Sequence, residues 1–294
     1  MPHKSGFVNI LGNPNVGKST LMNALSGVKL SIITSKVQTT RHRIMGIVNG
    51  ENFQIVYSDT PGIMRPVYKM QEQMVKFAYS TLTDADIILY VTDIYENIDL
   101  TQDIIARLRK IQIPVLMLIN KIDLGTQESV NQKINAWSDI LPNAEIIPVS
   151  ALEKFNLDKI FDRILSLLPE SPPYFPKDEI TDKSERFFAS EIIREKILMN
   201  YQKEIPYSVE VEIISFKESD ELIRVSANIY VERESQKGII IGRQGQALKK
   251  TGTMARKDLE DFFGKKVFLE TLVKVKKDWR NNPRILRQFG YFTN

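Results

Sequence analysis

The sequence predicts an α/β domain with a mostly parallel sheet, followed by a smaller α+β domain. Over residues 6–168, short apolar runs alternate with helical patterns, and this alternation is typical of a parallel sheet with helices on both faces. After a proline-rich segment, the pattern changes to a helix, two alternating runs, a second helix and a last strand. We therefore expect domains at 1–168 and 184–294, joined by a linker over 169–183.

The composition is that of a soluble globular protein. The 294 residues are 43% hydrophobic and 26% charged, and they suffice for two domains. No apolar run approaches the ~18 residues that span a bilayer, and the N-terminus lacks the apolar stretch of a secretory signal. The absence of cysteine excludes disulfides and thiolate metal sites, and the presence of only two histidines disfavours a histidine zinc site. These features fit a cytoplasmic protein, which we expect to be a monomer.

Charge is distributed unevenly along the chain. The formal net charge is +4, but residues 235–294 carry 14 Lys and Arg against 5 Asp and Glu. A basic block indicates either a polyanionic partner or a solvated basic surface, and charge alone does not decide between them. Peripheral contact with anionic lipid at the inner face of the cell membrane is a weaker alternative, because the sequence has no lipidation motif.

In the first domain, five apolar runs predict buried strands, and four segments have helical spacing. The strands are expected at 7–11, 53–57, 87–91, 114–119 and 145–149, and the helices at 19–25, 101–110, 130–140 and 157–168. A parallel sheet binds its ligands at the carboxyl ends of its strands. The polar motifs of this domain all follow predicted strands, where that rule places a ligand site.

The segment Gly12–Ser19 matches the phosphate-binding pattern G-x-x-x-x-G-K-[ST] between a predicted strand and a predicted helix. Backbone N–H groups of such a loop surround phosphates, and the following helix points its positive end at them. Lys18 adds charge at the β- and γ-phosphates, and the Ser19 hydroxyl coordinates Mg²⁺. The expected nucleotide contacts in this segment are Gly12, Asn13, Pro14, Asn15, Val16, Gly17, Lys18, Ser19 and Thr20.

The segment Asp59-Thr60-Pro61-Gly62 follows the next predicted strand of the chain. The Asp59 carboxylate can hold Mg²⁺, usually through water, and the Gly62 N–H can meet the γ-phosphate. A threonine of Thr39-Thr40-Arg41 could complete the magnesium shell, although this segment also fits a polar connecting loop. The sequence does not decide between Thr39 and Thr40, and we favour Thr40. The expected catalytic residues are therefore Lys18, Thr40, Asp59 and Gly62.

The segment Asn120-Lys121-Ile122-Asp123 predicts recognition of guanine. The Asp123 carboxylate can accept from both the N1–H and the exocyclic amine of guanine, a donor pair that adenine lacks. Asn120 can bond the other edge of the base and brace the phosphate loop, and the Lys121 stem can cover the base plane. A backbone N–H of Ser150-Ala151 is expected near the guanine O6. The predicted ligands are GTP or GDP together with Mg²⁺.

This set of motifs resembles the P-loop GTPases of the translation-factor class, and in particular the Era-type GTPases. The resemblance implies GTP hydrolysis. Ras-like enzymes have a glutamine after D-x-x-G that orients the attacking water, whereas this chain has Ile63, so the resemblance implies another route and slow intrinsic turnover. In some relatives the asparagine that matches Asn15 helps to bind K⁺ in place of an arginine finger, which makes K⁺ a candidate cofactor. Relatives often carry a basic residue where this chain has Asn13.

In the second domain, Gly242–Gly245 joins an apolar turn at 239–241 to a predicted helix at 246–263. The two glycines allow a nucleic-acid backbone to approach, and the helix start offers free N–H groups. One stripe of the helix is basic, and Leu248, Ala255, Leu259 and Phe262 lie on the apolar stripe. A lone G-x-x-G also fits an ordinary turn before a helix. The expected RNA contacts are Gly242, Arg243, Gln244, Gly245, Lys249, Lys250, Arg256 and Lys257.

The element order of this part resembles a type II KH domain, a fold that clamps about four nucleotides of single-stranded nucleic acid. It is formed by a helix at 184–200, strands at 208–216, 222–231 and 267–275, and the helices and loop at 239–263. The resemblance to Era-type GTPases covers nearly the whole chain. It implies binding near the 3′ end of 16S ribosomal RNA and a role in assembly of the 30S ribosomal subunit. The alternative is an RNA-binding assembly protein that binds GTP with little turnover.

Overall fold

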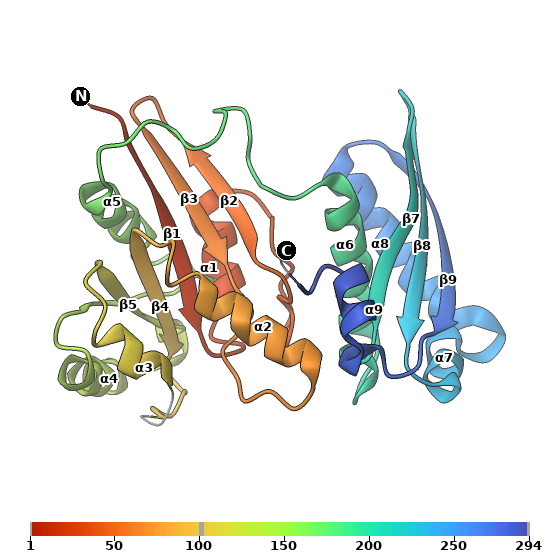
Figure 1. Ribbon diagram of the computed structural model, residues 1–294, viewed down its shortest axis with the longest axis horizontal. Helices are drawn as coiled ribbons and strands as arrows, with labels where there is room; N and C mark the ends of the chain where they lie inside the picture. The colour runs from red at the N-terminus through yellow and green to blue at the C-terminus, as the bar shows by residue number, and fades with distance from the viewer. Residues whose placement is uncertain (1, 100–102, 293–294) are drawn as a thin grey trace. The chain divides into compact units, whose positions relative to one another are not determined.

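The structure is a computed structural model that describes residues 2–99 and 103–292. Its internal contacts divide the chain into two compact units, whose elements are labelled in Figure 1. The first unit consists of residues 1–31, 40–65 and 74–182, and the second of residues 32–39, 66–73 and 183–294.

The first unit is built on a six-stranded sheet with the order β2-β3-β1-β4-β5-β6. Its strands are β1 (Lys4–Gly12), β2 (Ile44–Asn49), β3 (Phe53–Asp59), β4 (Ile87–Asp93), β5 (Val115–Asn120) and β6 (Glu145–Pro148). All neighbours pair in parallel except β2 and β3, which are antiparallel. The expected mostly parallel sheet is confirmed. The sequence analysis did not predict β2, in which Gly46 interrupts the apolar run because it packs against Leu30 and Met22.

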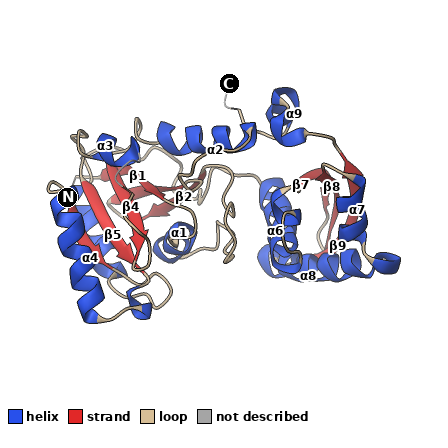
Figure 2. Cartoon of the chain, turned by 90° about the horizontal axis from the view of Figure 1, so that it is seen from below, coloured by secondary structure: helices blue, strands red, loops and turns tan. Residues whose placement is uncertain are grey.

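Helices flank this sheet on both faces (Figure 2). They are α1 (Lys18–Ser26), α2 (Lys69–Ser80), α3 (Asp103–Leu108), α4 (Gln127–Ile140) and α5 (Leu157–Leu167). Side chains of α2, α3 and α4 form one core with β4 and β5, and α1 packs with α5 near β1 and β3. The predicted helix at 101–110 is present as α3, and its first two residues lie outside the described part. The sequence analysis missed α2, whose buried Met74 and Ala78 have the four-residue spacing of a helix face.

The segment expected as a linker packs along the first unit. The Gln54 side chain on β3 accepts hydrogen bonds from the backbone N–H groups of Tyr174 and Phe175, at 2.7 and 3.0 Å. The Ile47 N–H on β2 donates to the Ile180 carbonyl at 2.9 Å. The prolines of this segment prevent regular helix formation, and the sheet edge supplies hydrogen-bond partners for its backbone. The segment is therefore ordered by the first unit over much of its length.

The second unit has a three-stranded sheet with the order β7-β8-β9, in which β7 is antiparallel and β9 parallel to β8. The strands are β7 (Glu210–Glu218), β8 (Leu222–Val231) and β9 (Lys266–Val275), and the helices are α6 (Glu185–Asn200), α7 (Glu234–Ile241), α8 (Gln246–Phe263) and α9 (Pro283–Gln288). This arrangement confirms the predicted α+β class. Within residues 2–99 and 103–292, no helix is long and apolar enough to cross a membrane.

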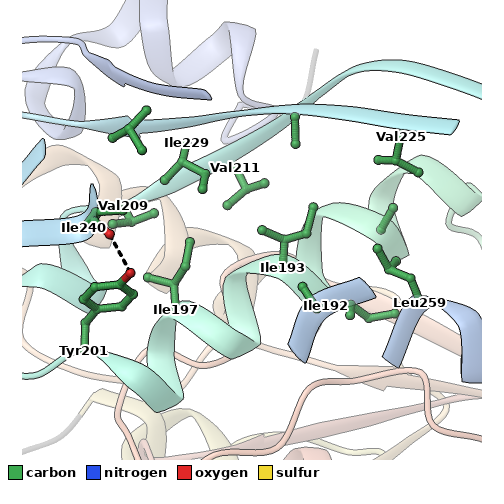
Figure 3. Packing of buried hydrophobic residues seen from close by; sticks show 14 of the residues in the cluster. Ile192, Ile193, Ile197, Tyr201, Val209, Val211, Val225, Ile229, Ile240 and Leu259 are labelled. Carbon is green, nitrogen blue, oxygen red and sulfur yellow. Dashed lines mark hydrogen bonds between the residues drawn. The ribbon is translucent and has the colours of Figure 1, made fainter. Parts of the chain in front are cut away.

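The core of the second unit lies between its sheet and its helices (Figure 3). Ile193 and Ile197 from α6 meet Val211 on β7 and Ile229 on β8, and the Tyr201 hydroxyl donates to the Ile240 carbonyl at 2.7 Å. Residues 239–241, expected as an apolar turn, form the last turn of α7, because burial of Ile240 in this core stabilises a helix there. The expected apolar turn is thus helical, in agreement with the KH-type element order, which has a helix before the glycine loop.

Aromatic residues near the C-terminus pack inside the second unit. Trp279 and Tyr291 are fully buried. The Trp279 Nε1–H donates to the Ser208 carbonyl at 2.9 Å, and the Tyr291 hydroxyl donates to the Glu210 carboxylate at 2.7 Å. These two aromatic side chains therefore belong to the interior of the second unit. On α8, Phe262 is partly exposed, and its ring centroid lies 5.2 Å from that of Phe188 on α6.

Candidate functional site

The loop between β1 and α1 has a backbone shape that depends on glycine. Gly12 and Gly17 have φ angles of 147° and 95°, and Asn15 has a φ of 66°. A Cβ atom at Gly17 would lie 2.2 Å from the Asn120 side-chain nitrogen, and one at Gly12 would lie 2.1 Å from the Val91 carbonyl oxygen. Side chains at these positions would displace neighbouring strand ends. The loop can therefore turn tightly and leave its N–H groups free to face an anion.

Lys18 lies inside this loop, and its side chain is 6% exposed. Its ammonium group donates to the Asn13 carbonyl at 2.8 Å. Burial lowers the pKa of Lys18 to about 8, against the opposing charges of Asp59 and Glu96. A buried cation that donates to a neutral backbone carbonyl gains favourable interactions when it meets an anion. Lys18 is thus placed to receive phosphate oxygens.

Three oxygen-bearing side chains from different parts of the first unit meet beside Lys18. The Ser19 hydroxyl lies 2.8 Å from the Thr40 hydroxyl, and both donate to the same Asp59 carboxylate oxygen, at 2.7 and 3.1 Å. Burial raises the pKa of Asp59, while Lys18 and the neighbouring hydroxyls act in the opposite direction. In the described part of the chain, the other Asp59 oxygen is buried without a hydrogen-bond partner. This donor set of hard oxygens around an unsatisfied carboxylate oxygen fits Mg²⁺.

The two threonines left open by the sequence have different surroundings. The Thr39 hydroxyl lies 2.9 Å from the Thr34 hydroxyl and donates to the Lys36 carbonyl at 2.6 Å. Of the two threonines, only Thr40 contacts Ser19 and Asp59 within the part of the chain that the structure describes. Thr40 is therefore the threonine that lies in the oxygen cluster with Ser19 and Asp59.

Gly62 and Ile63 follow β3 and lie against the phosphate loop. A Cβ atom at Gly62 would be 2.6 Å from the Pro14 backbone, so only glycine allows this close approach. The Ile63 N–H donates to the Gly12 carbonyl at 3.1 Å. The Ile63 side chain is buried in the core of α2, α3 and α4. It has no polar atom and does not point into solvent, so it cannot orient a water molecule.

The residues predicted to bind the base lie at the carboxyl ends of β5 and β6. The Asn120 side chain donates to the Val16 carbonyl at 2.8 Å and accepts from the Ala151 N–H at 3.0 Å. The Lys121 ammonium donates to the Asn15 carbonyl at 2.6 Å. Asn120 and Lys121 thus brace the phosphate loop. Asp123 is exposed in the short helix Ile122–Leu124, and Ser150 precedes Ala151 in the neighbouring loop.

The sequence analysis missed two acidic residues of this site. Asp93, at the end of β4, forms an ion pair with Lys121 at 2.7 Å. Glu96 follows three residues later, and its carboxylate accepts a hydrogen bond from the Asn13 side chain. Both follow the carboxyl end of a predicted strand, and this position was the available signal.

The second candidate site lies between α7 and α8 in the second unit. Residues Arg243–Gly245 form a single short turn, and Gly242, Gln244 and Gly245 have φ angles of 71°, 50° and 75°. The side chains of Arg243 and Gln244 are exposed. The turn therefore leaves the backbone at the start of α8 open to an extended polyanion.

The predicted basic stripe continues from this turn along α8. Lys249, Lys250 and Lys257 are exposed. Arg256 differs from them, because it forms an ion pair with Glu260 at 2.7 Å one turn further along the helix. The glycine turn and the three exposed lysines thus lie at the start of α8 and along it, whereas Arg256 is paired with Glu260 within the protein.

Comparison with known proteins identifies the family. Residues 7–121 match the family described as 50S ribosome-binding GTPase, and residues 204–280 match the KH domain family. GTPase Era from Clostridium kluyveri is 47% identical over 290 residues, which cover 98% of this chain and 99% of that protein. The chain belongs to the Era family of GTPases. The resemblance inferred from the motifs, including the C-terminal KH domain, is confirmed.

Further relatives agree with this assignment. GTPase Era from Syntrophus aciditrophicus is 50% identical over 293 residues, covering 98% of this chain and 95% of that protein. A crystal structure of Era in complex with MgGDPNP and nucleotides 1506–1542 of 16S ribosomal RNA is 42% identical, with a TM-score of 0.94 over 99% of this chain and all of that one. A structure of an Era variant from Aquifex aeolicus bound to GDP·AlF₄⁻ has the same identity, coverage and TM-score.

Proposed function

We propose that this GTPase is a switch whose nucleotide state controls how tightly its KH domain binds single-stranded RNA. We propose the 3′ region of 16S ribosomal RNA as the target and assembly of the 30S subunit as the process. The observation that carries the proposal is the cluster of Ser19, Thr40 and Asp59 beside Lys18, in a chain that also has an open glycine turn before a basic helix. The relative crystallised with MgGDPNP and 16S ribosomal RNA supports both ligands.

In this proposal each residue of the first site has a distinct role. Mg²⁺, when bound, neutralises charge on the β- and γ-phosphates. Ser19 and Thr40 would hold it directly, and Asp59 would hold it through water. Lys18 binds the phosphate oxygens, and the Gly62 N–H meets the third phosphate. Loss of that phosphate removes the contacts that hold Thr40 and Gly62 in place, and this is the event that makes the site a switch.

The two candidate functions differ in whether the protein positions a water molecule for attack on GTP. Because Ile63 is buried and apolar, it favours slow intrinsic hydrolysis. It is therefore also compatible with the second candidate function, that of an RNA-binding assembly protein that hydrolyses very little GTP. A single-turnover GTPase assay with and without an oligonucleotide of the 16S 3′ end distinguishes them. The switch predicts measurable hydrolysis that the RNA changes, whereas the alternative predicts negligible hydrolysis in both conditions.

We expect K⁺ to accelerate hydrolysis by several-fold over Na⁺, because Asn15 could help to hold a cation that takes the place of an arginine finger. Asn15 has a φ of 66° and lies at the exposed turn of the phosphate loop. The measurement is the GTPase rate in the two salts at equal ionic strength, with Asn15→Ala as the variant that should lose the difference. Equal rates in the wild-type protein would exclude the potassium proposal.

Replacement of Asp123 by asparagine should shift base preference from guanine toward xanthine. The amide can no longer accept both guanine donors, whereas it can donate to the additional carbonyl oxygen of xanthine. We expect GTP affinity to fall by about 100-fold or more, which corresponds to the loss of charge-assisted hydrogen bonds. Competition between GTP and xanthosine triphosphate measures the shift, and the exposed Asp139→Asn on α4 is the matched control. Unchanged selectivity would contradict the role of Asp123.

The two domains of the chain have separate roles in this proposal. We assign nucleotide binding to residues 1–168 and RNA binding to residues 184–294, with 169–183 connecting them. We propose a monomer that works in the cytoplasm, where ribosomal RNA is found.

Crosslinking of the protein to RNA in cells, followed by sequencing of the bound fragments, tests the proposed RNA target. Fragments that map away from the 3′ region of 16S ribosomal RNA would refute it.

A further inference from the structure

Glu96 holds a carboxylate group at the edge of the phosphate loop. The Asp93 carboxylate at the end of β4 accepts from the N–H groups of Tyr95 and Glu96, at 3.0 and 2.9 Å, so the chain turns sharply there. The turn directs the Glu96 side chain to Asn13. One carboxylate oxygen accepts from the Asn13 side chain, and the other accepts from the Thr92 hydroxyl at 2.5 Å. Two hydrogen bonds thus fix the position of the charge.

Neutral groups hold the Glu96 carboxylate in the described part of the chain. Among residues 2–99 and 103–292, no Lys or Arg forms an ion pair with this carboxylate. Asn13 supplies a neutral amide, and Lys133 donates to the Glu96 carbonyl rather than to its side chain. Asn13 also connects the carboxylate to Lys18, whose ammonium donates to the Asn13 carbonyl at 2.8 Å. A fixed negative charge therefore lies two hydrogen bonds away from the cation that receives phosphate.

The electrostatic influence of Glu96 reaches into the site. Asn13 contacts both groups, because its side chain donates to the Glu96 carboxylate and its carbonyl accepts from the Lys18 ammonium. Mg²⁺ would neutralise Asp59, because Asp59 belongs to the cluster that fits the metal. Glu96 lies outside that cluster, so a bound Mg²⁺ would not be coordinated by its carboxylate. Its repulsion acts on the phosphates, and it grows with the number of phosphate charges.

We propose that Glu96 is a specificity-determining residue that lowers the affinity for GTP relative to GDP through its negative charge at the phosphate loop. The inference rests on the proposed nucleotide site and adds a property that the binding motifs do not contain. A carboxylate in this position favours dissociation of GTP. The GTP-bound state is then populated mainly when a further interaction, such as that with RNA, contributes free energy to it.

The test compares Glu96→Gln with the wild-type protein in its full length. Glutamine keeps an acceptor for the Asn13 amide and removes the charge. We expect affinity for GDPNP to rise by about fivefold and affinity for GDP to rise less, since a charge that acts through several ångströms of partly solvated protein contributes on the order of 1 kcal/mol. Fluorescent GDPNP and GDP, titrated in the presence of Mg²⁺, measure both dissociation constants. The difference should shrink as salt is raised from about 0.05 to about 0.5 M.

Two further variants separate charge from structure. Glu51→Gln removes an exposed carboxylate in the β2–β3 hairpin, at the opposite end of the strands from the phosphate loop, and should leave both affinities unchanged. Asn13→Ala removes the hydrogen bond and keeps the Glu96 charge, so it should not raise the preference for GDPNP. An unchanged GDPNP-to-GDP affinity ratio in Glu96→Gln, or an equal loss of both affinities, overturns the proposal. A wild-type protein that binds neither nucleotide would instead refute the proposed function.

Discussion

Replacement of Lys18 by alanine should lower the affinity for GTP and GDP by at least about 100-fold, because charge-assisted hydrogen bonds contribute about 1.5–3 kcal/mol each and each 1.4 kcal/mol is a factor of ten. Lys18 is 6% exposed, and its ammonium donates to the Asn13 carbonyl. Phosphate oxygens would supply the remaining partners. Without the ammonium, the loop keeps its N–H groups but loses the only cation within the Gly12–Ser19 segment.

Isothermal titration with GTP and GDP measures this loss. Lys18→Met keeps much of the buried aliphatic stem, so it separates removal of charge from removal of volume. Lys159→Ala, an exposed lysine on α5, is the matched control and should bind as the wild type does. Thermal unfolding of each variant in the absence of nucleotide establishes that the fold persists. Retained GTP affinity in a folded Lys18→Met protein would contradict the assignment of the phosphate site.

Replacement of Gly242 and Gly245 by aspartate should lower RNA affinity by at least about tenfold and leave GTP affinity unchanged. Each aspartate places a negative charge where a phosphate backbone approaches the start of α8, and phosphate contacts supply much of the affinity for nucleic acid. The substitutions also fill the space that the glycines leave open. Binding of a fluorescent single-stranded RNA from the 16S 3′ end, measured alongside GTP titration, checks both parts of the prediction.

The two glycines differ in what a side chain would meet. A Cβ atom at Gly242 would lie 2.6 Å from the Ala247 Cβ, whereas one at Gly245 meets nothing within 4 Å. Gly245→Asp alone is therefore the less disruptive variant. Its control is Gly264→Asp at the other end of α8, because Gly264 also has a positive φ, of 66°, and equally open surroundings. If RNA affinity survives in Gly245→Asp and in the double variant, the glycine turn is not the RNA site.

Contiguous motifs explain why much of the candidate site could be predicted from the sequence. The phosphate loop needs glycine at positions 12 and 17 because the backbone turns there with positive φ and passes close to Val91 and Asn120. A requirement of this kind is local, so it is visible in a short stretch of sequence. The strand–helix alternation is local in the same sense, because the periodicity of apolar residues follows from the geometry of each element.

The missed features depend on contacts between distant segments. Strand β2 is short and contains Gly46, so its pairing with β3 is not visible in its own periodicity. The last turn of α7 appeared to be a loop because its apolar residues are consecutive, and only the core that receives Ile240 makes it helical. Glu96 reaches Asn13 across 83 positions of the chain, through the pairing of β1 with β4. No spacing rule links those two residues.

By itself, the sequence determined the order of the two domains, the nucleotide class and the glycine turn, because each is specified by residues that are adjacent or nearly adjacent in the chain. The tertiary structure decided which threonine meets Ser19 and Asp59, how Asn120 and Lys121 brace the phosphate loop, and that the Glu96 carboxylate lies beside it. These contacts join side chains from separate strand ends. Their positions depend on the register of the sheet, which the packing of the whole unit determines.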